Sequence, residues 1–525
     1  MAERWKFLHT TSWLIVGSVA ILTLVVEPVF PRPLYLFFGI SIGFILMTAS
    51  ILFYQTESQS QIVSTLAFVA ISGTILRVAG MTQVVLGSGD QRQLLSQAQI
   101  IVNSGAIDLW GHYETAPLYI LLMAFHSLIS DVGKFDASMV VTIASAFIPL
   151  LVAALAYITS RSLKTSMLSA VLTGVYALYL RSGILAEADG VAVIWFLSVS
   201  IMLMIFLRNK GIREEWLLVS MTVSSIFVHL LYSSIISSIV IGSLLLHSIL
   251  YMTLDRLDKS EQYSWKRSTY ILVPLIIGVA IPSRVLYSEQ GYRTLFIFHT
   301  LFEIPDASSL LKLIIPTSGA AAEGVGSSGD TSTGLLGSLI GNRSLALTLY
   351  HVGAVVLFAA IGAALTLLKS WRDNITFYAY TTVILGATTT AVVLQFDYNL
   401  SYRFYYFASI PLLVFASISI LRISGRNKLV AMVILLLLSG SFMVGPLVPL
   451  GNDLDPRFGG ESFAVTSSEY SQEQSIHFYM DRFPEKTSMI DSQGRSATCS
   501  PANESLIWDS GTYFVCYSSR QPTAK

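Results

Sequence analysis

Long apolar stretches follow one another along most of this chain, separated by short polar turns. Each stretch is roughly 16–24 residues long, and about 20 apolar residues let a helix cross the hydrocarbon core of a bilayer. In lipid, only helices and closed barrels satisfy their backbone groups, and barrel strands are much shorter than these stretches. The pattern predicts thirteen transmembrane helices, at about residues 11–29, 33–54, 61–79, 137–159, 165–183, 190–207, 215–232, 233–254, 268–283, 345–368, 373–396, 403–421 and 427–449.

One further apolar stretch, 115–129, is short and has Pro117 near its start, so it is either a fourteenth span or a re-entrant interfacial helix. Loop charge separates the two readings, because short cytoplasmic loops are rich in Lys and Arg. If 115–129 does not cross, the side of the N-terminus holds 16 of the 32 basic residues, in its terminus and five short loops: Arg4, Lys6, Arg161, Lys164, Arg208, Lys210, Arg213, Arg256, Lys259, Lys266, Arg267, Lys369, Arg372, Arg422, Arg426 and Lys428. We therefore expect a multi-pass protein of the cell membrane with a cytoplasmic N-terminus and an extracytoplasmic C-terminus.

The spans and the polar segments between them suggest three parts. Residues 1–60 form an N-terminal pair of transmembrane helices, whose first helix we interpret as a retained signal anchor, and 61–449 form the main transmembrane domain. Outer loops at 80–136 and 284–344 belong to that domain. The last part, 450–525, is a small extracytoplasmic domain. The expected fold class is an all-α polytopic membrane protein with a small C-terminal α+β tail.

The tail has the alternation of short strands at Ser488–Asp491 and Leu506–Tyr517, and a short helix is expected at Ile476–Phe483. Its Cys499 and Cys516 would lie on the oxidising side of the membrane, where a disulfide between them is favoured over metal ligation by sulfur.

Composition supports the membrane assignment. Of the 525 residues, 53% are apolar and 12% are charged, and the mean hydropathy is +0.65. A soluble domain carries about 25% charged residues, and a disordered chain has few apolar ones, so both classes are excluded. The formal net charge is zero. No nucleic-acid partner is therefore indicated.

Acidic residues gather in the loops expected outside. Asp90 follows the third span, and Glu187 and Asp189 lie in the short loop before the sixth. Glu114 stands with His112 and Tyr113 in the polar run that precedes 115–129. The alternative interpretation of each residue alone is helix capping or an ordinary solvated turn or, for Glu187 and Asp189, pairing with Arg181.

Cations near the same face need another explanation, because they break the basic-inside pattern. Arg403, next to Tyr402, opens the twelfth span, and Arg284 ends the ninth. Snorkelling to lipid head groups is one reading, and binding of a phosphate is the other. His229, near the outer end of the seventh span, is either a satisfied core residue or part of a pocket. Carboxylates and arginines on one face suit transfer from a lipid phosphate donor to an acceptor outside the cell.

The first outer loop carries a recognisable pattern. A transmembrane helix is followed by Gly-x-Gly-Asp-Gln and a helix at Leu94–Asn103 that ends near Gly105, and then by Tyr-x-x-x-Pro-Leu-Tyr-x-Leu-Leu in the re-entrant stretch. This arrangement resembles the GT-C glycosyltransferases, a superfamily that includes protein O-mannosyltransferases and aminoarabinose transferases. The resemblance covers about residues 80–210 in motif, and extends in topology to about 450.

The resemblance implies an integral membrane enzyme with a polyprenyl- or dolichyl-phosphate-linked sugar donor and a glycan, lipid or protein acceptor on the outer face. The first-loop acid of the family matches Asp90, as general base or as ligand of a divalent metal ion. The second-loop acid matches Glu187 or Asp189, so Asp90 and Asp189 form one candidate metal site. Arg403, Arg284 and Tyr402 would hold the donor phosphate, and His112, Tyr113, Glu114 and His229 would line the acceptor or donor pocket.

The chain departs from the family pattern at Gln91, where many relatives have a second acid after the position of Asp90. This difference weakens any assignment of acceptor or metal. No nucleotide-sugar site is expected, because the chain has no glycine-rich strand–helix unit.

Two other functions compete with glycosyl transfer. A secondary transporter would have ionisable groups near the membrane midplane, whereas the acids here lie in outer loops. A non-catalytic scaffold would act through its tail. Substrate uptake without sugar transfer would identify the transporter. Loss of function on deleting 450–525, with Asp90 dispensable, would identify the scaffold.

Overall fold

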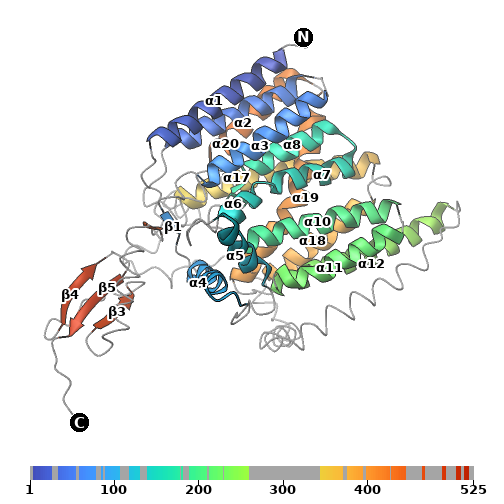
Figure 1. The fold of residues 1–525 in the computed structure, drawn as a ribbon. Helices are drawn as coiled ribbons and strands as arrows, with labels where there is room; N and C mark the ends of the chain where they lie inside the picture. The colour runs from blue at the N-terminus through green and yellow to red at the C-terminus, as the bar shows by residue number, and fades with distance from the viewer. Residues whose placement is uncertain are drawn as a thin grey trace, which may run out of the picture. The chain divides into compact units, whose positions relative to one another are not determined.

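A computed structural model describes most of the helical part of the chain and the strands of its tail (Figure 1). The described residues are 4–26, 34–54, 58–78, 84–86, 89–106, 117–130, 139–177, 179–180, 188–209, 212–228, 230–258, 343–370, 375–393, 398–425, 427–444, 464–466, 487–491, 504–509 and 513–518. The chain forms two compact units, residues 1–79 with 88–462, and residues 80–87 with 463–525.

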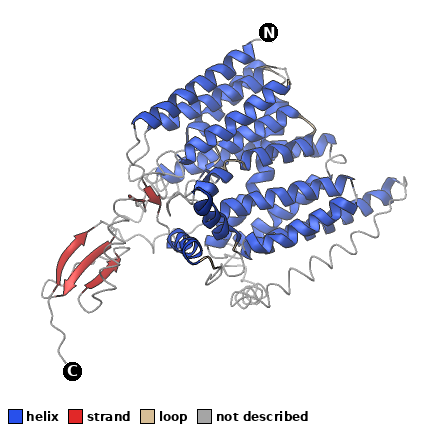
Figure 2. Ribbon diagram, in the orientation of Figure 1, coloured by secondary structure: helices blue, strands red, loops and turns tan. Residues whose placement is uncertain are grey.

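The described part of the first unit is helical (Figure 2). Its helices are α1 (Arg4–Val26), α2 (Leu34–Phe53), α3 (Gln59–Val78), α4 (Gly89–Ser104), α5 (Leu118–Ser130), α6 (Met139–Ser145), α7 (Ile148–Ser160), α8 (Leu163–Gly174), α10 (Ala188–Asn209), α11 (Ile212–Val228), α12 (Leu230–Asp258), α17 (Arg343–Ser370), α18 (Ile375–Val393), α19 (Tyr398–Ser424) and α20 (Lys428–Val444). Every predicted span coincides with one or two of these helices, except 268–283, which lies outside the described residues.

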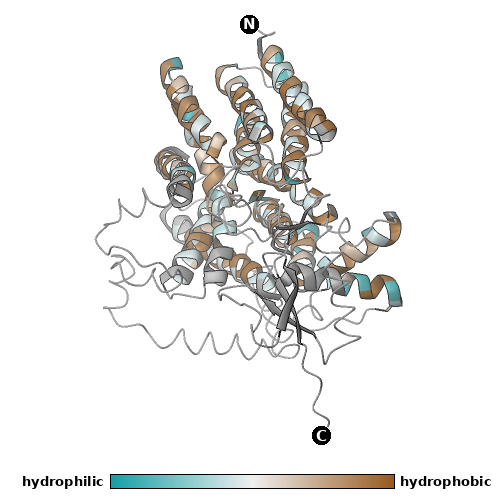
Figure 3. Ribbon diagram, turned by 90° about the vertical axis from the view of Figure 1, so that its left-hand side faces the viewer, coloured by the Kyte–Doolittle hydropathy of each residue, from teal (hydrophilic) through white to brown (hydrophobic). Residues whose placement is uncertain are grey.

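Six of the described helical segments are long and apolar enough to cross a membrane: Tyr35–Phe53, Gln59–Val78, Met139–Ser160, Gly190–Arg208, Tyr350–Leu368 and Phe404–Ser424. Leu118–Ser130, Ile235–Leu250 and Lys428–Val444 are apolar but shorter. Figure 3 shows apolar residues along most of the described helices. These are the features of a multi-pass membrane protein, whereas the count of thirteen spans and their direction stay predictions.

The stretch at 115–129 forms helix α5, which packs between α4 and α6. Its 13 residues extend about 20 Å, less than the ~30 Å thickness of the hydrocarbon core. The length of α5 therefore favours a helix that does not cross the membrane alone. Helix α4 ends where the sequence predicted, because Gly105 adopts a left-handed conformation with φ of 68° and its N–H caps the carbonyl of Ile101.

Helices α17 and α19 approach each other closely at Gly362. The α-carbon of Gly362 in α17 faces the backbone carbonyl of Phe415 in α19, and the space there admits no β-carbon. Small residues allow helices to approach this closely in membranes, where van der Waals packing holds helices together. Gly362 thus allows the close contact between these two helices, which have 28 and 27 residues.

Helix α8 is shorter than the predicted span at 165–183. It ends at Gly174, and Val175 and Tyr176 leave the helical path. A β-carbon at Gly174 would lie 2.8 Å from Phe44 and 3.0 Å from Val69, so α2 and α3 press directly on this turn. The break frees backbone groups that a continuous helix would pair, and those groups need partners from other helices.

The second unit contains two antiparallel sheets. In the first, β1 (Val84–Leu86) pairs with β2 (Ala464–Thr466), so that part of the predicted first outer loop joins the tail. In the second, β5 (Tyr513–Ser518) lies between β3 (Thr487–Asp491) and β4 (Glu504–Asp509). The two predicted strand regions are confirmed, the second of them as the pair β4 and β5. The predicted helix Ile476–Phe483 lies outside the described residues.

Candidate functional site

The structure describes the backbone at four of the predicted site residues. Asp90 is the second residue of α4 and Asp189 is the second residue of α10. Tyr402 and Arg403 lie in the second turn of α19. The remaining predicted site residues, Glu187, His112, Tyr113, Glu114, His229 and Arg284, lie outside the described residues.

The segments that carry these positions meet through one buried polar junction, which begins at Arg77. This arginine lies in the last turn of α3, ahead of the loop that leads to Asp90, and its side chain is fully buried. Its Nη1 donates to the carbonyl of Gly73 over 2.9 Å, and its Nη2 donates to the carbonyl of Tyr179 over 3.0 Å. Arg77 therefore connects the end of α3, which precedes Asp90, to the segment around Tyr179, which precedes Glu187.

Tyr179 extends the junction to α19. Its hydroxyl lies 2.7 Å from the carbonyl oxygen of Tyr406 and 2.6 Å from Oγ of Ser409. The hydroxyl donates to the carbonyl, and Ser409 in turn bonds the same carbonyl over 2.9 Å. Tyr406 is three residues beyond Arg403, so it lies about one helical turn away. Tyr179 thus holds the first turns of α19 against the same segment that Arg77 contacts.

His351 in α17 completes the junction at the helix break. The backbone N–H of Ala177 donates to its Nε2 over 3.3 Å, so this nitrogen is the acceptor. Nδ1 must then carry the proton, and it donates to Oγ of Ser441 in α20 over 2.8 Å. The ring of Tyr176 packs against the imidazole, with centroids 5.2 Å apart. His351 therefore acts as a fixed neutral acceptor that ties α17 and α20 to the broken end of α8.

The junction solves the backbone problem that the break in α8 creates. The N–H of Ala177, which the break leaves without an acceptor in its own helix, finds a partner in His351, and the carbonyl of Tyr179 finds one in Arg77. It also fixes the relative positions of α3, the 175–180 segment and α19. We therefore term Arg77, Tyr179, Tyr406, Ser409 and His351 the outer junction, after the predicted extracytoplasmic side of these segments.

Arg77 lies near the end of the third predicted span, 61–79, and the sequence does not assign it a role. The signal was present, because ionisable residues inside membrane helices are costly and rarely idle. Its partner was not predictable, since Tyr179 lies 102 residues away in the sequence.

Metal binding receives no direct support from the described residues, among which no group of three His, Cys, Asp or Glu side chains lies together. The predicted disulfide stays a prediction as well. Cys516 lies within β5, opposite Ser488 and Leu506, whereas Cys499 falls outside the described part of the tail.

No protein-family model and no curated protein matches this chain. Solved structures do. One is the oligosaccharyltransferase of Archaeoglobus fulgidus, crystallised with zinc and sulfate, at 13% identity and a TM-score of 0.43 over 73% of this chain and 53% of that one. Another is apo ArnT from Cupriavidus metallidurans, at 11% identity and a TM-score of 0.36 over 89% of this chain and 100% of that one. Both are GT-C glycosyltransferases.

The chain spans about half the length of the oligosaccharyltransferase that it matches. Both TM-scores lie below 0.5, so neither likeness by itself identifies the activity of this protein or the role of any of its residues.

Proposed function

We propose that this protein is an integral membrane glycosyltransferase of the GT-C type. It takes a sugar from a polyprenyl- or dolichyl-phosphate-linked donor and transfers it to a glycan, lipid or protein acceptor on the outer face of the membrane. The observation that carries the proposal is the outer junction. Its hydrogen bonds connect Arg77, Tyr179 and Tyr406. These three residues lie next to the segments that contain Asp90, the Glu187/Asp189 pair and Arg403, respectively.

Rigid attachment of the loops matters for this chemistry because group transfer depends on holding the reacting groups in the right geometry. Arg77 precedes the Asp90 loop, Tyr179 precedes the loop of the second acid, and Tyr406 lies one turn beyond Arg403. The hydrogen bonds among Arg77, Tyr179 and Tyr406 limit how far the loops can separate. The arrangement supports a single outer site built from segments that are far apart in the sequence.

In the proposed reaction, Asp90 accepts the proton of an acceptor hydroxyl as that oxygen attacks the anomeric carbon of the donor sugar. The bond between this carbon and the phosphate oxygen breaks as the new glycosidic bond forms. Both electrons of the broken bond leave with the polyprenyl phosphate, whose charge Arg403 and Arg284 stabilise with Tyr402. The second acid, Glu187 or Asp189, orients the acceptor or the donor sugar.

The test uses the full chain in lipid nanodiscs with radiolabelled sugars on polyprenyl phosphate and on dolichyl phosphate, and measures release of the lipid phosphate. Asp90→Asn is expected to lower the rate at least ~100-fold, as for loss of a general base. Glu214→Gln is the matched control, because Glu214 is also an acid in the first turn of a helix, α11, on the predicted inner face. Equal rates for Asp90→Asn and native protein would refute the role of Asp90.

A divalent ion held by Asp90 and Asp189 is a second form of the same proposal, because carboxylate oxygens are the ligands that hard divalent ions prefer. Treatment with EDTA followed by Mg²⁺ or Mn²⁺ separates the two forms. Loss and recovery of transfer would favour the metal-dependent form, and unchanged transfer would favour Asp90 acting as base alone.

A further inference from the structure

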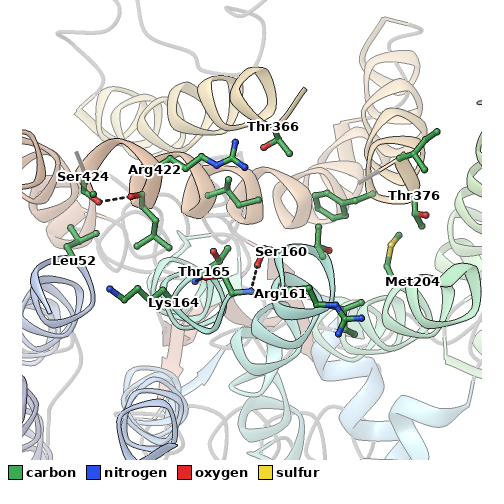
Figure 4. A pocket seen from close by; sticks show the side chains of 18 of the residues that line it. Leu52, Ser160, Arg161, Lys164, Thr165, Met204, Thr366, Thr376, Arg422 and Ser424 are labelled. Atoms are coloured by element: carbon green, nitrogen blue, oxygen red, sulfur yellow. Dashed lines mark hydrogen bonds between the residues drawn. The ribbon is translucent and has the colours of Figure 1, made fainter. Parts of the chain in front are cut away.

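A cavity of about 1050 Å³ lies among helix ends on the face opposite to the outer junction. The ends of α2, α7, α10 and α19 and the starts of α8, α18 and α20 surround it (Figure 4). Phe53, which closes α2, lines the cavity, whereas Arg77 lies 18 residues after the start of the next helix, α3. At 1.5 Å per residue, about 27 Å separates Arg77 from Gln59, the first residue of α3, which follows Phe53 by six residues. The proposed outer site and this cavity are therefore distinct.

The cavity is strongly cationic. Its lining includes Arg161, Lys164, Arg208, Arg422 and Lys428, and none of the residues described around it is acidic. Helix dipoles do not offset these charges, because positive helix starts and negative helix ends both meet here and largely cancel. Basic loops on one face are expected of membrane proteins, but that rule does not explain why charges from separate loops line one cavity.

Two of the arginines have structural roles at the end of α7. Arg208 donates from Nη1 to the carbonyl of Ile158 over 3.2 Å, which satisfies a carbonyl in the last turn of the helix. Arg161 occupies the C-cap with φ of 56°, and its backbone N–H bonds the carbonyl of Tyr157. Glycine is the usual residue at such a position, so the side chain there is retained despite the backbone conformation. The charges of Arg161 and Arg208 also repel each other.

The helix dipole does not account for the positions of the two lysines. Lys164 is the second residue of α8 and Lys428 is the first of α20, and a helix start disfavours cations. Neutral side chains already cap both starts: Ser162 accepts from the N–H of Thr165, and Asn427 accepts from the N–H of Leu429. Each lysine thus adds charge where its own helix disfavours it.

Arg422 supplies an independent observation. It lies in the last turn of α19 and lines the cavity, and its Nη1 is buried without any hydrogen-bond partner in the protein. A buried guanidinium nitrogen without a partner is costly, so such a group points to a ligand that supplies the missing acceptor. Figure 4 shows the guanidinium of Arg422 across the cavity from Lys164 and Arg161.

Apolar side chains also line the cavity beside hydroxyl groups, and they include Leu52, Phe53, Met204, Leu207 and Phe377. A ligand that suits both surfaces has an anionic oxygen-rich group and hydrocarbon. We propose that this cavity binds the phosphate-bearing head group of an anionic phospholipid. The phosphate oxygens accept from Arg422 and lie near Lys164 and Lys428, and the glycerol and upper acyl chains contact the apolar walls. This site is independent of the proposed transferase activity.

The test compares retention of phosphatidylglycerol and phosphatidylcholine with identical acyl chains, by native mass spectrometry of the full chain released from mixed-lipid nanodiscs. The native protein is expected to retain phosphatidylglycerol preferentially. Each cation near an anionic lipid contributes about fivefold in affinity. The double variant Lys164→Gln/Lys428→Gln is therefore expected to lose about 25-fold. Because it removes cations from helix starts, it is not expected to impair folding.

The matched control is Arg213→Gln. Arg213 is the second residue of α11, as Lys164 is of α8, and it follows the inner end of α10 but does not line the cavity. It is expected to leave retention unchanged. Arg422→Gln is the second test variant and is expected to weaken retention about fivefold.

Native retention by both test variants, or an equal loss in Arg213→Gln, would overturn the proposal. Inorganic phosphate provides the last arm, because a free phosphate offers the same oxygens without hydrocarbon. Retention of phosphatidylglycerol in millimolar phosphate supports a lipid site, whereas displacement by it at those concentrations would assign the cavity to a soluble phosphate and overturn the lipid proposal.

Discussion

The guanidinium of Arg77 donates a hydrogen bond from Nη2 to the backbone carbonyl of Tyr179, 3.0 Å away and 102 residues later in the chain. That carbonyl belongs to the segment that follows the break in α8 at Gly174. The bond connects α3 to the segment that leads into the predicted second acidic loop.

Replacing Arg77 with Met is expected to destabilise the protein by about 1–3 kcal/mol, because a buried carbonyl loses a charged donor. Arg77→Lys keeps the charge but offers a single ammonium in place of the planar fork, so an intermediate loss is expected. Thermal unfolding of the detergent-solubilised protein measures both. A Met variant as stable as native protein would show that the Tyr179 carbonyl finds another donor.

Tyr179→Phe removes the hydroxyl that bonds Tyr406 and Ser409 at the start of α19. About 1 kcal/mol of stability is expected to be lost. If the proposed function holds, Arg403 is no longer held firmly, and donor KM is expected to rise several-fold. The matched control is Tyr380→Phe, which breaks another buried bond, from Tyr380 to Ser200 over 2.9 Å. That variant is expected to lose similar stability with KM unchanged, and an equal KM change in both would argue against a positioning role for Tyr179.

Gly362→Ala is expected to separate α17 from α19, since a β-carbon at this position has no room against the carbonyl of Phe415. Overpacking of this kind costs about 1–3 kcal/mol. Gly353→Ala in the same helix is the control, because no atom lies within 4 Å of the added carbon and alanine favours helix. The unfolding temperature should fall for the first variant and stay level or rise for the second.

The predicted Cys499–Cys516 disulfide has a direct chemical test. Denatured protein purified without reductant should resist alkylation at both cysteines, and prior reduction should make both reactive. A loop of about 15 residues closed by a disulfide is stabilised by about 3 kcal/mol, so Cys499→Ser is expected to loosen the tail sheet. Alkylation of both thiols before reduction would contradict the pairing.

Much of the helical plan was predictable because membrane spans are long apolar stretches with polar ends. The sequence also indicated that 115–129 does not cross. The cavity supports that interpretation: Phe53 and Arg161 both line it, and α3 and α6–α7 already account for the two crossings between them. An extra crossing by α5 would place Arg161 on the other face.

The break after Gly174 was not predicted, because apolar residues continue on both sides of this glycine and glycine is tolerated within membrane helices. Phe44 and Val69 press on Gly174, and only the folded bundle brings them there. The outer junction follows from this break and was missed for the same reason. The predicted convergence of Asp90, Asp189 and Arg403 concerns side chains, and so it stays a prediction that the mutational tests above address.

Strand β1 has a practical consequence for anyone shortening this protein. Val84–Leu86 precede Asp90 by only a few residues and take their sheet partner from Ala464–Thr466. Truncation before residue 464 would therefore strip the first outer loop of its anchor as well as removing the tail. Lost activity in such a deletion would not distinguish a tail that recruits partners from a transferase whose first loop has come loose, whereas point substitutions at Asp90 would.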